Sequence, residues 1–110
     1  MAEKNTEINI KGFLSMLGLS RRAGKVIIGT PLVTSTLPSG KVKVTFYTSD
    51  ASENTKKRIT DKCSFYNTEC IMIDIPSDMV GKMVGMKSSV CVVGVTDDNF
   101  SKQLKALIQE

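Results

Sequence analysis

The chain has 110 residues, a formal net charge of +4 and 41% hydrophobic residues. This length predicts one domain over residues 1–110, with about 1–8 and 109–110 frayed, and the apolar content suffices for a core without a metal or disulfide staple. The lack of histidine removes the usual base of serine and cysteine triads, and no apolar run reaches the roughly 18 residues that span a membrane.

The first predicted helix covers about residues 9–21 and leads into a short strand. Its apolar residues recur at i, i+3, i+4 and i+7: Ile10, Phe13, Leu14 and Leu17. Arg21 suits the negative end of this helix, and Gly24 is well suited to end it. The segment "KVIIG" then predicts a strand.

A second helix begins at Pro31, with Thr30 as its N-cap. Its expected apolar side consists of Leu32, Val33 and Leu37. "PSG" at 38–40 ends this helix, and "KVKVTFYT" predicts the next strand.

The third predicted helix covers residues 49–66. Asp50 followed by Glu53 resembles a capping box at its start. The side chains expected to face the core are Ile59, Cys63 and Tyr66. "CIMIDI" then predicts a buried strand.

The last third of the chain repeats the alternation. Pro76 and Ser77 open a short helix whose apolar residues are Met79, Val80, Met83 and Val84. "GMKSS" is a tight loop, and the fully apolar "VCVVGV" predicts a central strand. Asp97 or Asp98 caps a final helix with an apolar side of Phe100, Leu104, Leu107 and Ile108. Regular alternation predicts an α/β protein, a three-layer α/β/α sandwich around about four strands.

Cysteine usage and the N-terminus both indicate a cytoplasmic protein. Cys63, Cys70 and Cys91 are odd in number and lack CxxC spacing, so we expect small buried hydrophobes rather than a redox or metal site. "MAEKNTEINI" is polar and acidic, unlike a signal or transit peptide. We expect no cofactor and no metal.

Charge is distributed unevenly along the chain. Seven basic and two acidic residues precede Asp50, a net charge of +5, and residues 50–110 hold eight basic and nine acidic residues, a net charge of −1. This asymmetry favours an anionic partner approached by the first part of the chain, or else a basic surface that only confers solubility.

The stretch "RRAGKVIIGTPLVTS" at 21–35 concentrates these features. Its glycine spacing resembles a phosphate loop but lacks the Lys-Ser/Thr pair that follows the second glycine. Unpaired amides at the start of the second helix, with Arg21, Arg22 and Lys25 upstream, would suit a phosphate or a base edge. The alternative is a turn that serves stability alone.

Two other features are interpreted as structural. Most of the six aromatic residues fall on core-facing positions, so a base-stacking platform is not expected. The basic run "NTKKR" at 54–58 is interpreted as a solvated helix face.

Three segments together carry a family resemblance: "LGLSRRAGKVIIGTPLV", "SGKVKVTFYTSDASENTKKRITDKCSFYN" and "VGKMVG" before the last strand. They resemble the kink-turn RNA-binding ribosomal proteins related to archaeal L7Ae and eukaryotic L30e, in particular a bacterial YlxQ-type branch. The resemblance covers residues 11–107 and implies a mixed four-stranded sheet. It also implies an RNA surface at the N-terminus of the second helix and in the loop before the last strand.

This chain departs from the family at the base-reading positions. Gly29 and Thr30 keep the motif, but Pro31 replaces the Asn or Lys that reads a guanine, Leu32 replaces a Glu or Gln, and Ser35 replaces a Lys. Each lost bidentate contact removes about 1–3 kcal/mol of discrimination. We therefore expect RNA binding through phosphates, aided by Lys41, with weakened base specificity.

The leading hypothesis is a non-catalytic protein that docks on structured RNA, either rRNA or a kink-turn, with ribosomal proteins as further partners and no membrane. The predicted contact residues are Arg21, Arg22, Lys25, Gly29, Thr30, Pro31, Leu32, Ser35, Lys82, Met86, Lys87 and Ser88. The alternative is a protein-interaction module of the same fold in which Leu32 forms part of an apolar contact patch.

Overall fold

The computed structural model describes residues 6–108. Of the residues expected to fray (1–8 and 109–110), residues 6–8 belong to the first helix, and the others lie outside the described residues. Helices and strands alternate along the described chain: α1 (Thr6–Arg22), β1 (Val26–Ile28), α2 (Thr30–Thr36), β2 (Val44–Thr48), α3 (Glu53–Phe65), β3 (Glu69–Ile73), α4 (Ser77–Met83), β4 (Val92–Val95) and α5 (Asp98–Ile108). A short 3₁₀ turn at Leu37–Ser39 follows α2. The predicted alternation is confirmed.

The four strands form one mixed sheet in the order β1-β4-β2-β3. β2 and β3 run parallel, whereas β4 is antiparallel to both β1 and β2. As a result, residues 28–29, 48–50 and 90–92 lie at one end of the sheet, and residues 25, 43 and 96 lie at the other. We call the first of these the pocket end.

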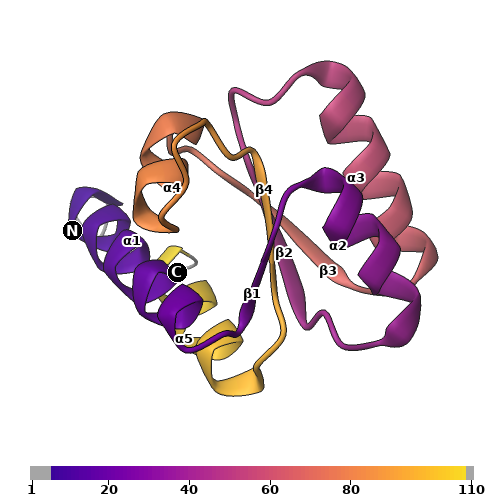
Figure 1. Ribbon diagram of the computed structural model, residues 1–110, viewed down its shortest axis with the longest axis horizontal. Coiled ribbons are helices and arrows are strands. Elements are labelled where there is room, and N and C mark those ends of the chain that lie inside the picture. The colour runs from indigo at the N-terminus through magenta and orange to yellow at the C-terminus, as the bar shows by residue number, and fades with distance from the viewer. Residues whose placement is uncertain (1–5, 109–110) are drawn as a thin grey trace.

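Helices cover both faces of the sheet, with α1, α4 and α5 on one side and α2 and α3 on the other (Figure 1). The larger core centres on Phe13 and Phe46, whose ring centroids are 5.0 Å apart at 81°. The smaller core includes Val33, Ile59 and Cys63, all fully buried. The predicted three-layer α/β/α sandwich is confirmed.

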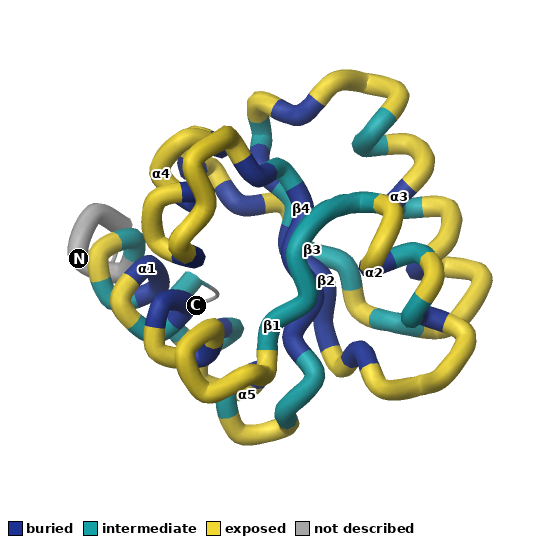
Figure 2. Tube along the Cα trace, viewed as in Figure 1, coloured by how far each residue is buried: buried dark blue, intermediate teal, exposed yellow. Residues whose placement is uncertain are grey.

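The burial predicted from the apolar sequence is confirmed for β4 and is wrong for β3. Every residue of β4 is buried, as expected for a strand between two neighbours with helices on both faces (Figure 2). β3 was predicted to be buried, but it is an edge strand with Glu69 and Met72 exposed. Only one of its sides is covered by a neighbouring strand, so its apolar sequence does not guarantee burial.

Two predicted N-caps are wrong. The N-cap of α2 is Gly29, which has no side chain to form a cap, and Thr30 is already helical. The N-cap of α3 is Ser52, whose hydroxyl accepts a hydrogen bond from the Thr55 N–H at 3.1 Å. The cap predicted for α5 is confirmed as Asp97, which accepts from the Phe100 N–H at 3.0 Å.

Several side chains expected to face the core are exposed instead: Leu32 (59%), Tyr66 (36%), Met79 (41%) and Met83 (37%). In α4, Val80 and Val84 are one turn apart and fill the core. The two methionines precede them by one position each and therefore lie on the neighbouring strip of the helix.

Asp50 ties the end of β2 to the start of α4 and offers a test of the fold. Its Oδ2 accepts hydrogen bonds from the N–H and the hydroxyl of Ser77, each at 3.0 Å. The Ser77 N–H, followed by the Thr48 hydroxyl, lowers the pKa of Asp50 below its ordinary value.

We expect Asp50→Ala to reduce the free energy of unfolding by about 1 kcal/mol at neutral pH, less than for a buried charged hydrogen bond because this side chain is exposed. Because the folded-state pKa is depressed, this contribution is complete above the ordinary carboxyl range near pH 4 and is lost as the pH falls through the lowered pKa. Urea unfolding of both proteins at pH 7 and pH 3 checks this. An equal difference at both pH values would contradict it.

Candidate functional site

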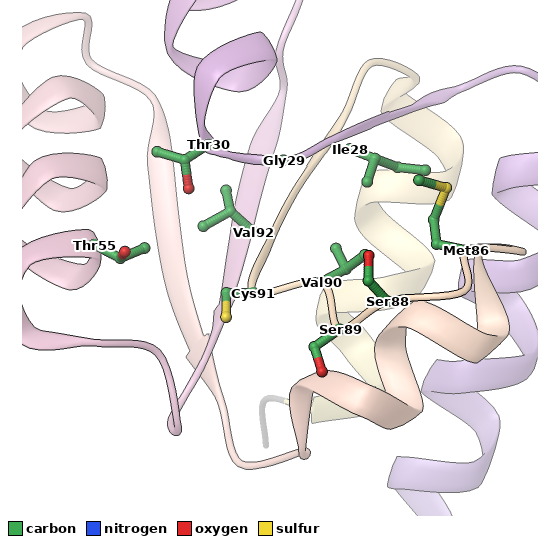
Figure 3. Close-up of a pocket in the computed structure, with 10 residues that line it drawn as sticks. All are labelled: Ile28, Gly29, Thr30, Thr55, Met86, Ser88, Ser89, Val90, Cys91 and Val92. Carbon is green, nitrogen blue, oxygen red and sulfur yellow. The ribbon is translucent and has the colours of Figure 1, made fainter.

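The start of α2 and the loop before β4, two segments far apart in the sequence, meet at the pocket end of the sheet. Between them lies a pocket of about 380 Å³. Gly29 and Thr30 line one side, Met86 and Ser88 line the other, and Thr55 contributes from α3 (Figure 3). The lining is completed by Ile28, Ser89 and residues 90–92. The pocket therefore combines hydroxyl groups from three segments with apolar side chains.

The backbone at Gly29 fixes where α2 begins. Gly29 has φ 96° and ψ 150°, a conformation adopted almost only by glycine. Its N–H donates to the Val92 carbonyl at 2.9 Å, and its carbonyl accepts from the Val33 N–H at 3.0 Å. α2 is thus attached to β4 through its N-cap residue.

The first turn of α2 leaves two backbone donors without partners. Within residues 6–108, neither Thr30 nor Leu32 donates its N–H to an acceptor, and Pro31 has no N–H to donate. The hydroxyls further along α2 donate to backbone carbonyls of the same helix. For example, the Ser35 hydroxyl donates to the Leu32 carbonyl at 3.0 Å. Free donors are therefore concentrated beside the pocket.

The loop at residues 85–90 is held by α4. The Met86 N–H donates to the Gly81 carbonyl at 2.8 Å, and the Val90 N–H donates to the Ser77 carbonyl at 3.0 Å. Gly81 is buried, and a Cβ at this position would collide with the Ser88 carbonyl. The wall of the pocket thus depends on the close approach of α4.

A second hollow, of about 430 Å³, lies over the open edge of β1. All three residues of β1 line it, together with Arg21, Leu32, Thr36 and Met86. The Arg21 Nε donates to the Val84 carbonyl at 3.2 Å, which holds this side chain beside the loop. Met86 lines both hollows.

The predicted basic residues divide between the two ends of the sheet. Arg21 lies at the second hollow, and Lys82 and Lys87 are exposed on α4 and on the pocket loop. Lys25 precedes β1, and its backbone carbonyl accepts a hydrogen bond from the Thr96 N–H at 2.9 Å. Lys25 therefore lies at the end of the sheet opposite the pocket. Lys41, just before β2, also lies away from the pocket end.

The three cysteines lie in or against the smaller core. Cys63 is buried, whereas Cys70 and Cys91 are partly buried, and all three are free. The neighbouring Cys63 thiol, together with burial, raises the pKa of Cys70. Among residues 6–108, no group of three or more metal-ligating side chains occurs, and no helix is long and apolar enough to cross a membrane.

Sequence reasoning did not identify Thr55 as a pocket residue. β1 and β2 point the same way because both are antiparallel to β4, so the helices that follow them both start at the pocket end. This relationship depends on strand order, which local sequence patterns do not reveal.

The comparisons with known proteins agree with this architecture. A family model described as the ribosomal protein L7Ae/L30e/S12e/Gadd45 family matches residues 12–105. RNA-binding protein YlxQ of Enterococcus faecium is 36% identical over 103 residues, covering 94% of this chain and 97% of that protein. RNA-binding protein YlxQ of Bacillus subtilis (strain 168) is 37% identical over 93 residues, covering 84% and 91%.

Solved structures show the same fold. A protein of unknown function from Bacillus halodurans C superposes with a TM-score of 0.82 at 36% identity, covering 89% of this chain and 97% of that one. The Giardia lamblia 15.5kD RNA binding protein superposes with a TM-score of 0.73 at 10% identity, covering 94% and 84%. None of these names describes an enzyme, in agreement with the predicted non-catalytic role. The match over residues 12–105 and the identity to both YlxQ proteins show that the chain belongs to the ribosomal protein L7Ae/L30e/S12e/Gadd45 family.

Proposed function

We propose that this protein is a non-catalytic, cytoplasmic RNA-binding protein that docks the start of α2 and the loop at 85–90 on structured RNA. The observation that carries the proposal is the meeting of these two segments around one pocket, because they are the two segments that the family resemblance implies as RNA contacts. The names of the relatives from Enterococcus faecium and Bacillus subtilis support RNA as the partner.

Phosphate contacts would supply most of the affinity. Arg21 stands at the second hollow with its Nε on the Val84 carbonyl, which leaves the terminal guanidinium nitrogens to donate to phosphate oxygens. Lys82 and Lys87 are also exposed, on α4 and on the loop at 85–90. The free N–H groups of Thr30 and Leu32 add neutral donors at the pocket. Such contacts position RNA without reading its sequence.

Base discrimination would be weak at α2. Pro31 lacks the N–H, and the 59% exposed Leu32 side chain offers only apolar contact where a base-reading polar group is expected. We therefore propose that the target is recognised by shape and backbone, as in a kink-turn or folded rRNA, with neighbouring ribosomal proteins as further partners.

The salt dependence of binding tests this proposal. With a kink-turn RNA duplex as the probe, log K should fall linearly with log salt concentration, with a slope of about −0.7 to −0.9 for each phosphate contact. Failure of the protein to bind structured RNA even at low salt would overturn the proposal.

Replacing Arg21 and Arg22 together by alanine should weaken binding to this duplex about 10-fold and make the salt slope shallower by roughly 0.7–0.9 per lost contact. The matched control is Lys57→Ala with Lys102→Ala, which removes the same charge elsewhere and should retain more of the affinity. Equal losses in both double variants would mean that net charge alone matters.

A protein-interaction module remains the second candidate, favoured by the apolar hollow over the open edge of β1. Leu32 and Met86 line this hollow and are both exposed. Leu32→Asp should weaken RNA binding through repulsion and should abolish an apolar protein contact, so the candidates are distinguished by which ligand the wild type binds and the variant loses. A bound protein partner that is lost in this variant, without any affinity of the wild type for RNA, would favour the module.

A further inference from the structure

The C-terminal end of α3 carries two exposed aromatic rings. Phe65 is 76% exposed and Tyr66 is 36% exposed, so these two rings do not occupy the core-facing positions expected for most of the aromatic residues. Their ring centroids lie 4.8 Å apart at 85°. In such a T-shaped pair, at least one face of Phe65 is left uncovered by Tyr66.

These rings continue a strip of cations along the same side of α3. Arg58 and Lys62 are one turn apart, and Phe65 and Tyr66 follow Lys62 at i+3 and i+4, which makes the four side chains neighbours on the helix surface. Arg58 and Lys62 are exposed, and within residues 6–108 neither forms an ion pair. We call these four residues the α3 strip.

The other two lysines of α3, Lys56 and Lys57, form ion pairs within the helix. Lys56 pairs with Glu53 at 3.6 Å, and Lys57 pairs with Asp61 at 3.3 Å. The basic run at 54–58, interpreted from sequence as a solvated face, therefore separates into a paired side and an unpaired side. Arg58 and Lys62 on the unpaired side lead to both aromatic rings, and the paired Asp61 of the other side also neighbours Phe65, at i−4.

The strip starts close to the proposed RNA site. Thr55, in the first turn of α3, lines the pocket, and α3 runs away from the pocket end of the sheet (Figure 1). At 1.5 Å per residue, Arg58 lies about 4–5 Å and Phe65 about 15 Å beyond Thr55 along the helix axis. A strand that leaves the pocket can follow α3 over this distance.

We propose that the α3 strip binds an unpaired RNA strand that flanks the structured part of the target. Arg58 and Lys62 bind phosphates, and a base stacks on the open face of Phe65, held by Tyr66. The unpaired positive charges favour an anionic strand over an apolar protein surface, and stacking on aromatic rings tolerates any base. This inference rests on RNA being the partner, and it adds a contact surface that the pocket does not supply.

Two probes separate this inference from the proposed function: oligouridine of about ten nucleotides, and a kink-turn duplex without unpaired ends. Phe65→Ala should weaken oligouridine binding about 5- to 160-fold, the range for loss of one stacked base. Phe65→Trp should keep the affinity, and neither change should affect the blunt duplex. Arg58→Ala with Lys62→Ala should make the oligouridine salt slope shallower by about 0.7 per lost contact.

Lys57→Ala is the matched control, because it removes a charge of the same helix that is already paired with Asp61. It should leave oligouridine binding near the wild-type value. A second readout is the fluorescence of Tyr66, which should be quenched by oligouridine and restored in Phe65→Ala, with Tyr47 as the only other tyrosine.

Wild-type protein that fails to bind oligouridine, or a Phe65→Ala variant that binds it unchanged, would overturn the inference. So would a wild-type dimer that Phe65→Ala disperses without any change in oligouridine affinity, because the rings would then serve a protein contact. Failure of the wild type to bind the blunt duplex would instead count against the proposed function. The inference about the α3 strip would then be decided by oligouridine binding alone.

Discussion

Gly81→Ala is expected to lower the free energy of unfolding by about 2–3 kcal/mol and to weaken binding of a kink-turn duplex by at least about 10-fold. The added Cβ would collide with the backbone carbonyl of Ser88, and no side-chain rotation can relieve a clash with backbone. α4 and the pocket loop must therefore separate. This separation strains the hydrogen bonds that Met86 and Val90 donate to α4 and displaces one wall of the pocket.

Urea unfolding and duplex affinity, both measured well below the unfolding transition, check this expectation. Gly12→Ala is the matched control, because Gly12 is also helical but its added Cβ meets only the movable end of the Leu107 side chain, at 3.1 Å. Alanine is favoured over glycine in helices by about 1 kcal/mol, so this control should be neutral or stabilising and should bind RNA normally. Wild-type behaviour of Gly81→Ala would show that the loop does not pack on α4 as described.

The fold was largely predictable from local patterns. Alternation of helical and strand periodicities predicted the nine α-helices and strands of residues 6–108, and the apolar run at 90–95 predicted a central strand, because these signals reside in consecutive residues. What local patterns could not provide was the order of the strands. β3 was expected to be buried because its sequence is apolar, yet it lies at the edge of the sheet, and no feature of its own sequence records that position.

The caps show the same limit on a smaller scale. In the segment "SDASE", Asp50 and Ser52 are both possible N-cap acceptors for the helix that follows, and sequence rules favoured Asp50. In the structure, Ser52 caps α3, and Asp50 binds Ser77 at the start of α4, 27 residues later. Both side chains accept hydrogen bonds at the start of a helix. Which helix each one binds is decided by tertiary contacts and not by the local sequence.

The candidate site was predicted by segment but not by geometry. The turn at 21–35 was proposed from its own residues as well as from the resemblance, and the loop before the last strand was proposed from the resemblance. The structure brings Gly29, Thr30, Met86 and Ser88 to one pocket, while their role in RNA binding stays a prediction. Lys25 was grouped with Arg21 because it is near in sequence, yet it lies at the opposite end of β1. The three residues of β1 separate Lys25 at one end of the sheet from Gly29 at the other.

Exposure was the property that sequence predicted least well. Periodicity placed Leu32 and Tyr66 towards the core, but α2 is only seven residues long and Tyr66 follows the last residue of α3. Short helices and helix ends bury less of their apolar side than the pattern suggests, because fewer neighbours cover them. Both residues consequently stand on the surfaces for which we propose RNA contacts.

Gly29→Asn is expected to cost about 2–3 kcal/mol of unfolding free energy and to reduce duplex affinity by more than the stability loss alone explains. Its φ of 96° and ψ of 150° belong to a region open almost only to glycine, and the nearest atom to an added Cβ is the Pro31 Cδ at an ordinary 3.9 Å. The cost is therefore backbone strain and not a collision. A shift to a common conformation would break the Gly29–Val92 hydrogen bond and turn the free N–H groups of Thr30 and Leu32 away from the pocket.

Gly40→Asn separates this effect from glycine replacement in general. Gly40 has φ 77° and ψ 4°, near the left-handed helical region that asparagine tolerates, and no atom lies within 4 Å of an added Cβ. Its substitution should lower stability by less than about 1 kcal/mol and leave RNA binding unchanged. Thermal unfolding and duplex affinity of both variants test whether the backbone conformation of Gly29 positions α2. If the two variants behave alike, the geometry at Gly29 does not set the position of α2. If only Gly29→Asn loses affinity, the start of α2 must be held in place on β4 for the pocket to bind RNA.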